Sequence, residues 1–181
     1  GLHREHCGKI YCRIINTMKK LEEVFKRKQN ILSVYFTAGY PNLNDTGDTI
    51  KYLQKYGADI IEAGIPYSDP MADGETIQNS SNIALKSGIN PNIVFEQLKT
   101  IKNEIDIPLV IMAYLNQMLV FGAEQFLKLC KDANVQALII PDLPLDEYET
   151  RYKDVFNEFG ISNIFLITPQ TSKERINKID E

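Results

Sequence analysis

The sequence predicts an α/β fold in which parallel strands alternate with helices. Five short runs of apolar, β-branched residues recur along the chain, at 31–37, 58–65, 107–113, 135–141 and 161–168. Such nearly continuous hydrophobicity is typical of strands that are buried on both faces of a parallel sheet. Stretches with helical periodicity separate these runs, so the unit of a strand followed by a helix repeats along the chain.

The predicted helices have recognisable faces and ends. Ile50, Leu53 and Tyr56 share one helical face, and that stretch ends at Gly57, a natural C-cap. Asn90 followed by Pro91 is typical of an N-cap with proline at the first helical position. Spacings of three and four predict the core faces of the next helices: Val94, Leu98, Ile101 and Ile105; Phe126, Leu129 and Cys130; Val155, Phe156 and Phe159. Residues 171–174 form a capping box that opens a last helix.

Two architectures fit this pattern, an open doubly wound sheet and part of a (β/α) barrel. A doubly wound sheet usually has a glycine-rich phosphate-binding turn after its first strand, and the segment 37–41, Thr-Ala-Gly-Tyr-Pro, lacks that pattern. A barrel is therefore favoured. A complete barrel takes about 250 residues, whereas this chain has 181. We expect an incomplete barrel of about five parallel βα units.

Composition excludes several classes of protein. With 44% hydrophobic and 24% charged residues, the chain resembles one globular domain. It contains no apolar run near the roughly 20 residues that a membrane-spanning helix needs. Residues 1–29 carry eight basic and three acidic side chains, whereas residues 30–181 carry 12 basic and 21 acidic ones. An acidic body argues against a nucleic-acid-binding protein.

The first residues differ from the rest of the chain. His3, His6, Cys7 and Cys12 lie there, but their spacing matches no common structural zinc pattern, so no metal site is expected. We interpret residues 1–17 as a disordered leader or an added segment, and residues 18–181 as the domain. Because residues 1–17 lack the apolar core of a secretory signal, we expect a reduced, cytoplasmic protein.

Candidate catalytic side chains occur within the second apolar run. Among the five runs, only Asp59 and Glu62 are ionisable residues of the Asp, Glu, Lys, Arg and His types. Glu62 stands near the carboxyl end of its run, where α/β enzymes keep their active sites. From the strand pattern alone, Glu62 is either a proton-transfer group or a carboxylate that faces an outer helix and pairs with a lysine. No histidine occurs from residue 30 onward, so acid-base chemistry must use carboxylates, tyrosines or lysines.

The segment that follows favours the functional interpretation. Residues 62–74, Glu-Ala-Gly-Ile-Pro-Tyr-Ser-Asp-Pro-Met-Ala-Asp-Gly, with Thr-Ile-Gln at 76–78, closely resemble the signature of the tryptophan synthase α subunit family. The resemblance runs from about Leu21 to about Ile179, and includes the segments 37–41, 114–116 and 141–144. It implies an eight-stranded (β/α) TIM barrel. It also implies a lyase that cleaves indole-3-glycerol phosphate to indole and glyceraldehyde 3-phosphate.

The resemblance also implies roles for individual residues. Glu62 and Asp73 match the two catalytic carboxylates of the family, and Asp69 and Pro70 fall in the loop that faces its β subunit. Tyr35, Met112 and Tyr114 match positions of the indole pocket, although Met112 is equally interpretable as core. Asp142 either helps to order the site or is an ordinary turn residue.

The same resemblance implies a partner and leaves alternatives open. Family members pass indole to a β subunit in an α2β2 assembly, and pyridoxal phosphate is expected only on that subunit, with no cofactor on this chain. The phosphate-binding loops that follow strands seven and eight of such a barrel are expected to lie outside these five units. Two other functions are a lyase that releases indole without a partner and a non-catalytic module that docks on a β-type subunit and activates it. The presence of both Glu62 and Asp73 argues against the docking module, because docking needs neither.

Overall fold

The computed structural model describes residues 20–27, 29–70 and 73–180. Residues 1–17, interpreted above as a leader, lie outside the described residues, and so do His3, His6, Cys7 and Cys12. Within those ranges, no helix is both long and apolar enough to cross a membrane.

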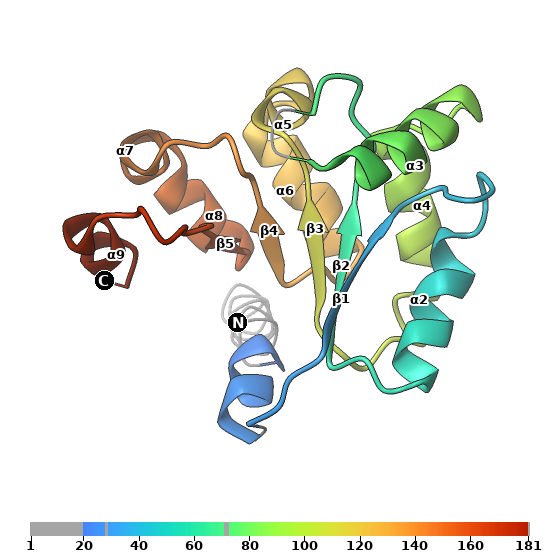
Figure 1. The fold of residues 1–181 in the computed structure, drawn as a ribbon, viewed down its shortest axis with the longest axis horizontal. Helices are drawn as coiled ribbons and strands as arrows, with labels where there is room; N and C mark the ends of the chain where they lie inside the picture. The colour runs from blue at the N-terminus through green and yellow to red at the C-terminus, as the bar shows by residue number, and fades with distance from the viewer. Residues whose placement is uncertain (1–19, 28, 71–72, 181) are drawn as a thin grey trace, which may run out of the picture.

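The centre of the molecule is one parallel sheet whose strands follow one another in chain order (Figure 1). Its strands are β1 (Ser33–Thr37), β2 (Ile60–Gly64), β3 (Leu109–Met112), β4 (Ala137–Ile139) and β5 (Ser162–Ile164). Each strand pairs in parallel with the next one. The prediction of a partial barrel of about five βα units is confirmed, and each strand is shorter than the apolar run that predicts it.

Most of the helices cover one face of this sheet (Figure 1). The helices are α2 (Thr46–Lys55), α3 (Glu75–Lys86), α4 (Pro91–Ile101), α5 (Leu115–Phe121), α6 (Ala123–Asp132), α7 (Leu145–Glu147), the π-helix η1 (Tyr148–Tyr152), α8 (Lys153–Phe159) and α9 (Lys173–Asp180). The last of them, α9, buries no residue. A further helical segment at 20–27 lies beside the amino ends of the strands, whereas α3 and α5 begin near the carboxyl ends (Figure 1).

Alternate residues of each strand enter two different apolar clusters. Ile61, Ile111 and Leu138 pack with the helices in the larger cluster, which also contains Cys130, as predicted. Ile60, Val110, Ala137 and Ile139 form the smaller cluster on the inner face of the sheet, against which Leu21 and Val24 of segment 20–27 pack. Because the side chains of a strand alternate between its faces, this division identifies the inner face at every position.

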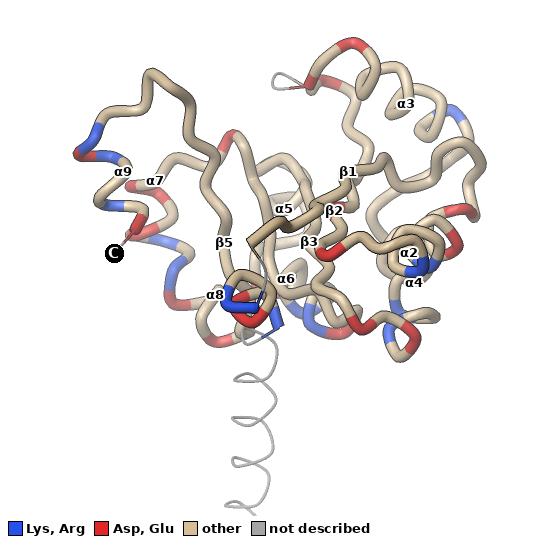
Figure 2. The backbone as a smooth tube through the Cα atoms, turned by 60° about the horizontal axis from the view of Figure 1, so that its bottom comes forward, with Lys and Arg blue, Asp and Glu red and all other residues tan. Residues whose placement is uncertain are grey.

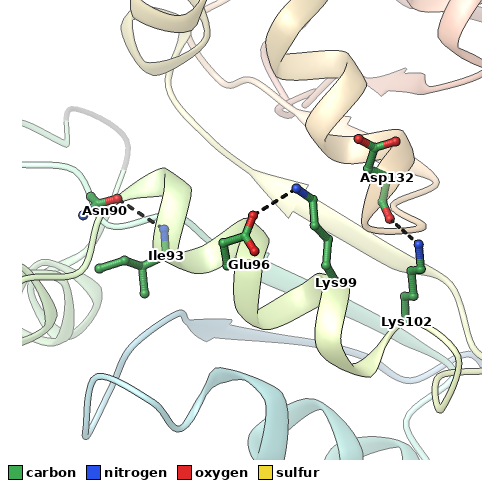
Figure 3. A network of polar contacts seen from close by, with 6 residues as sticks. All are labelled: Asn90, Ile93, Glu96, Lys99, Lys102 and Asp132. Carbon is green, nitrogen blue, oxygen red and sulfur yellow. Dashed lines mark hydrogen bonds and ion pairs between the residues drawn. The ribbon is translucent and has the colours of Figure 1, made fainter.

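Helix α4 shows how the outer layer is held together (Figure 3). The Asn90 side chain accepts a hydrogen bond from the Ile93 N–H at 3.2 Å, which confirms the predicted N-cap. Lys99 pairs with Glu96 at 3.0 Å on the surface of the same helix. Lys102, just after α4, donates to the carbonyl of Asp132 at the end of α6 at 3.2 Å, and so links two helices of the layer.

Several ends of predicted elements differ from the structure. The last apolar run forms a strand only as far as Ile164, and Leu166 and Ile167 are 53% and 55% exposed. Tyr56 is not on the buried face of α2, because it follows the last helical residue and is 77% exposed. The cap of α9 is shifted by one residue: Ser172, not Thr171, accepts the hydrogen bond from the helix, at 3.2 Å from the Arg175 nitrogen.

Charged residues lie mainly on helices and loops, and the strands carry almost none (Figure 2). Within the five strands of the described chain, Glu62 is the sole charged residue. A half-buried carboxylate at such a position is a candidate functional residue.

Phe126 offers a test of the larger apolar cluster, between the sheet and the helices. It is fully buried on α6, and its ring meets Phe95 edge to face at 5.3 Å. We expect Phe126→Ala to lower the free energy of unfolding by about 3–5 kcal/mol, because the substitution leaves a cavity between helices. Denaturant unfolding measures this loss. Phe25→Ala, at a position that is 62% exposed, is the matched control and should change stability by less than about 0.5 kcal/mol. Equal effects of the two changes would contradict the packing described here.

Candidate active site

Glu62 lies on the inner face of the sheet. The register places it beside Tyr35 of β1 and Val110 of β3. Val110 and Ile60, which is two residues before Glu62, belong to the inner cluster, so the carboxylate points away from the helices and is half-buried. The structure therefore excludes the alternative in which Glu62 pairs with a lysine of an outer helix.

The two acids of the second apolar run have different surroundings. Glu62 accepts a hydrogen bond from the hydroxyl of Ser33 at 2.5 Å, a length typical of a hydroxyl that donates to a carboxylate. Asp59 precedes β2, and its carboxylate accepts the Leu32 N–H at 3.0 Å. Asp59 thus helps to join the start of β2 to the segment before β1, whereas Glu62 faces the interior of the partial barrel.

Tyr35 extends along the inner face toward the carboxyl ends of the strands. A Cβ atom on Gly64 would overlap the Tyr35 phenol, so the ring can occupy this place only because residue 64 is glycine. Burial raises the pKa of Tyr35 to about 12; a hydrogen bond with Thr37 opposes the rise, and Asp73, Tyr114 and Glu62 add to it. Both carboxylates and the Tyr114 phenol therefore lie within electrostatic reach of the Tyr35 hydroxyl.

Asp73 stands just before α3 at the rim of the sheet. The Tyr114 hydroxyl donates a hydrogen bond to its Oδ2 atom at 3.2 Å. Tyr114, at the junction of β3 and α5, is only 5% exposed, and its ring stacks on Tyr67 with centroids 5.0 Å apart. The Asn116 amide donates to the Tyr67 hydroxyl at 3.3 Å. Residues of the β2–α3 connection are thus bound to the β3–α5 junction.

Asp142 orders this junction. Its Oδ1 atom accepts the N–H of Leu115, the first residue of α5, at 2.8 Å. Because Leu115 directly follows Tyr114, this bond fixes the backbone beside the Tyr114 ring. Of the two interpretations of Asp142, the structure supports ordering of the site over an ordinary turn residue.

The remaining predicted residues lie around this centre. Met112 is half-buried next to Gly64 in the register and packs against the inner cluster, so it faces the same interior as Glu62 and also contributes to the core. Asp69 is exposed on the β2–α3 connection, where its carboxylate accepts the Ser68 hydroxyl at 2.8 Å, and Pro70 beside it is half-buried. Both lie on the connection between β2 and Asp73.

Ser33, Tyr67 and Gln117 also belong to this site, although the sequence does not predict their roles. Gln117 accepts the Tyr114 N–H at 3.0 Å and donates to the Pro66 carbonyl at 3.0 Å. Ser33 shares a strand face with Tyr35 because the two are two positions apart, but only the register between β1 and β2 shows that this face is also that of Glu62. Tyr67 lies within the signature, in a segment whose prolines and glycines resemble an ordinary turn, so the sequence does not indicate its contact with Tyr114.

The chemistry available at this site comes from two carboxylates and two phenols. Glu62 lies on the inner face of the sheet and Asp73 lies at its rim, with Tyr35 and Tyr114 nearby. Among the residues that the structure describes, no group of three or more His, Cys, Asp or Glu side chains is arranged to hold a metal ion. A ligand placed between the carboxylates would meet aromatic faces together with two proton-transfer groups.

Comparison with known proteins identifies the family that this chain matches. The model of the family "Tryptophan synthase alpha chain" matches residues 21–181. The tryptophan synthase alpha chain of Flavobacterium psychrophilum is 52% identical over 163 residues, covering 90% of this chain and 64% of that protein. That of Christiangramia forsetii is 51% identical with the same coverage. This chain therefore spans a little less than two thirds of the length of these curated relatives.

Solved structures share the fold. The crystal structure of tryptophan synthase subunit alpha from Legionella pneumophila aligns with a TM-score of 0.81 and 36% identity, over 92% of this chain and 63% of that one. A chain of the tryptophan synthase complex from Pyrococcus furiosus aligns with a TM-score of 0.78 and 37% identity, over 83% and 61%. With a family model that spans the described domain and relatives of this similarity, the chain belongs to the tryptophan synthase alpha chain family.

Proposed function

We propose that this chain carries the acid-base residues of a carbon–carbon lyase of tryptophan biosynthesis. The reaction is the retro-aldol cleavage of indole-3-glycerol phosphate to indole and glyceraldehyde 3-phosphate. The observation that supports it best is the meeting of Glu62 and Asp73 with Tyr35 and Tyr114 at the carboxyl ends of β1 to β3. The carboxylates come from the signature segment, whereas the phenols come from β1 and from the junction of β3 and α5.

Proton transfer by Glu62 accounts for the chemical steps. Its carboxyl group donates a proton to indole C3, which makes the ring an iminium cation. Glu62, now ionised, accepts the proton of the glycerol hydroxyl next to the bond that breaks. The electrons of that hydroxyl form the aldehyde, and the electron pair of the broken carbon–carbon bond returns to the ring to give neutral indole.

Asp73 stabilises the cation that forms in this sequence. Its carboxylate accepts a hydrogen bond from the indole N–H, and its negative charge lowers the energy of the positively charged ring. The Tyr114 hydroxyl donates to Oδ2 at 3.2 Å, and we propose that Oδ1 accepts the indole N–H. Oriented in this way, Asp73 needs little rearrangement when charge develops.

Aromatic and apolar side chains form the proposed indole slot. Tyr35, Tyr114 and Met112 supply faces against which a planar ring can pack. Burial raises the pKa of Tyr35 from 10 to about 12, so its phenol, which is neutral at pH 7 in any case, stays neutral even in alkaline solution. Since indole serves as its own electron acceptor, we propose that this chain uses no cofactor, and that pyridoxal phosphate is bound by a partner.

We propose a β-type subunit in an α2β2 assembly as that partner. The similar chain from Pyrococcus furiosus comes from a tryptophan synthase complex, and Asp69 of this chain lies exposed on the connection that leads to Asp73. A lyase that works without a partner would keep the same carboxylates and would not respond to a β subunit. The binding experiment below distinguishes these two cases.

Glu62 is the first group to test, in the full-length gene product. We expect Glu62→Gln to lower the rate of indole release by about 100- to 10,000-fold, because the amide keeps the shape and loses the proton-transfer group. Glu96→Gln, on the outer surface of α4 (Figure 3), is the matched control and should retain the wild-type rate. Near wild-type cleavage by Glu62→Gln would refute the proposed role.

Asp73 is tested through its charge. We expect Asp73→Asn to lower kcat by about 100- to 1,000-fold, because the amide still accepts hydrogen bonds but no longer offsets the charge of the indole cation. Steady-state kinetics of indole release measures the change. The control is Asp154→Asn, at an exposed position of α8. If Asp73→Asn raised KM and left kcat unchanged, Asp73 would be a binding group only.

The partner surface is tested by charge reversal. We expect Asp69→Lys to weaken binding to the β subunit, because the side chain is exposed on a loop at the rim of the site. Calorimetric titration gives the affinity, and circular dichroism shows whether folding is retained. The same reversal at exposed Asp48 of α2 should leave binding unchanged. If Asp69→Lys leaves the affinity unchanged, this loop is not the partner surface.

A further inference from the structure

Gln117 is a buried polar residue near the start of α5 that uses both ends of its amide. It is 8% exposed. Its Oε1 atom accepts the backbone N–H of Tyr114 at 3.0 Å. Its Nε2 atom donates to the carbonyl of Pro66, on the β2–α3 connection, at 3.0 Å. One side chain therefore joins two segments that lie 51 positions apart in the sequence.

Helix capping accounts for only one of these bonds. Gln117 is the third residue of α5, and a bond from the N-cap N–H to a Gln or Glu at this position is the usual capping-box contact. The bond to Pro66 stabilises no helix end. It leaves α5 and reaches the carbonyl that follows β2 by two residues, within the segment that links Glu62 to Asp73.

The bond to Pro66 is one of several contacts that hold this connection against Tyr114. Tyr67, the next residue, stacks on the Tyr114 ring, and Asp73 accepts the Tyr114 hydroxyl at 3.2 Å. The backbone of Tyr114 is held by Gln117, and that of Leu115 by Asp142. A shift of Pro66 relative to Tyr114 would thus disturb both the stack and the bond to Asp73.

We propose that Gln117 is a positioning residue for the lyase reaction: by binding Pro66 and Tyr114 together, it holds Asp73 where it meets the substrate. The role in catalysis rests on the function proposed above. The link between the two segments does not, and it can be measured without any substrate.

Gln117→Glu separates the two bonds. The carboxylate still accepts the Tyr114 N–H, as a glutamate in a capping box does, but it has no hydrogen to donate and it repels the Pro66 carbonyl. In the full-length gene product, we expect the amide of Ile65, which precedes Pro66 and donates to the Met112 carbonyl at 2.9 Å, to exchange with solvent about tenfold faster, as the loss of one buried hydrogen bond predicts. We expect kcat for indole release to fall by about 10- to 100-fold with a smaller change in KM, because Asp73 acts mainly on the transition state.

Two further variants complete the test. Gln125→Glu, the same change at an exposed site on α6, should leave both exchange and kcat at wild-type values. Gln117→Leu loses both bonds without adding a charge, and should increase exchange at Ile65 even if Gln117→Glu folds poorly. Wild-type exchange at Ile65 in a folded Gln117→Glu or Gln117→Leu protein would overturn the proposal. So would faster exchange with unchanged kcat in an active enzyme.

The outcomes also separate this proposal from the proposed function. If the wild-type protein releases no indole, the lyase assignment fails. Faster exchange in Gln117→Glu would then still support the link between Pro66 and Tyr114, whereas unchanged exchange would reject it.

Discussion

The register between β1, β2 and β3 is the constraint on which the site depends. It places Tyr35, Glu62 and Val110 in one row on the inner face of the sheet. A slip of one residue would turn every side chain of the strand to the opposite face. Glu62 would then enter the apolar layer beneath the helices, and Ile61 would enter the inner face. Burial of Ile61 and Ala63 against the helices therefore stabilises the same register that keeps the carboxylate inside.

The second constraint is the attachment of the β2–α3 connection to the β3–α5 junction. Tyr114 is the centre of this attachment, since its ring contacts Tyr67, its hydroxyl contacts Asp73 and its N–H is bound by Gln117. A connection that is rich in proline and glycine has few helical or sheet hydrogen bonds of its own. Side chains from the neighbouring unit supply them instead, and in this way adjacent βα units of a barrel share one site.

Close packing around Tyr35 also limits which residues can form the site. Tyr35 reaches across Gly64, where any side chain would overlap its phenol. The glycine of the signature therefore serves a tyrosine of another strand, although the two residues are far apart in the sequence. Burial and the neighbouring carboxylates together raise the pKa of Tyr35, so its phenol stays neutral beside two acids even in alkaline solution.

The sequence by itself determined the order of strands and helices, the parallel sheet and the signature that contains Glu62 and Asp73, because these follow from local hydrophobic periodicity and from adjacent residues. It did not determine which face Glu62 occupies, the hydrogen bond from Ser33, or the roles of Tyr67, Asp142 and Gln117. It also extended the last strand to Leu166 and Ile167, which are exposed. These features depend on register and on contacts between distant segments, and only the packed tertiary structure decides them, since hydrogen bonds across the sheet and between loops leave no periodic pattern in the chain.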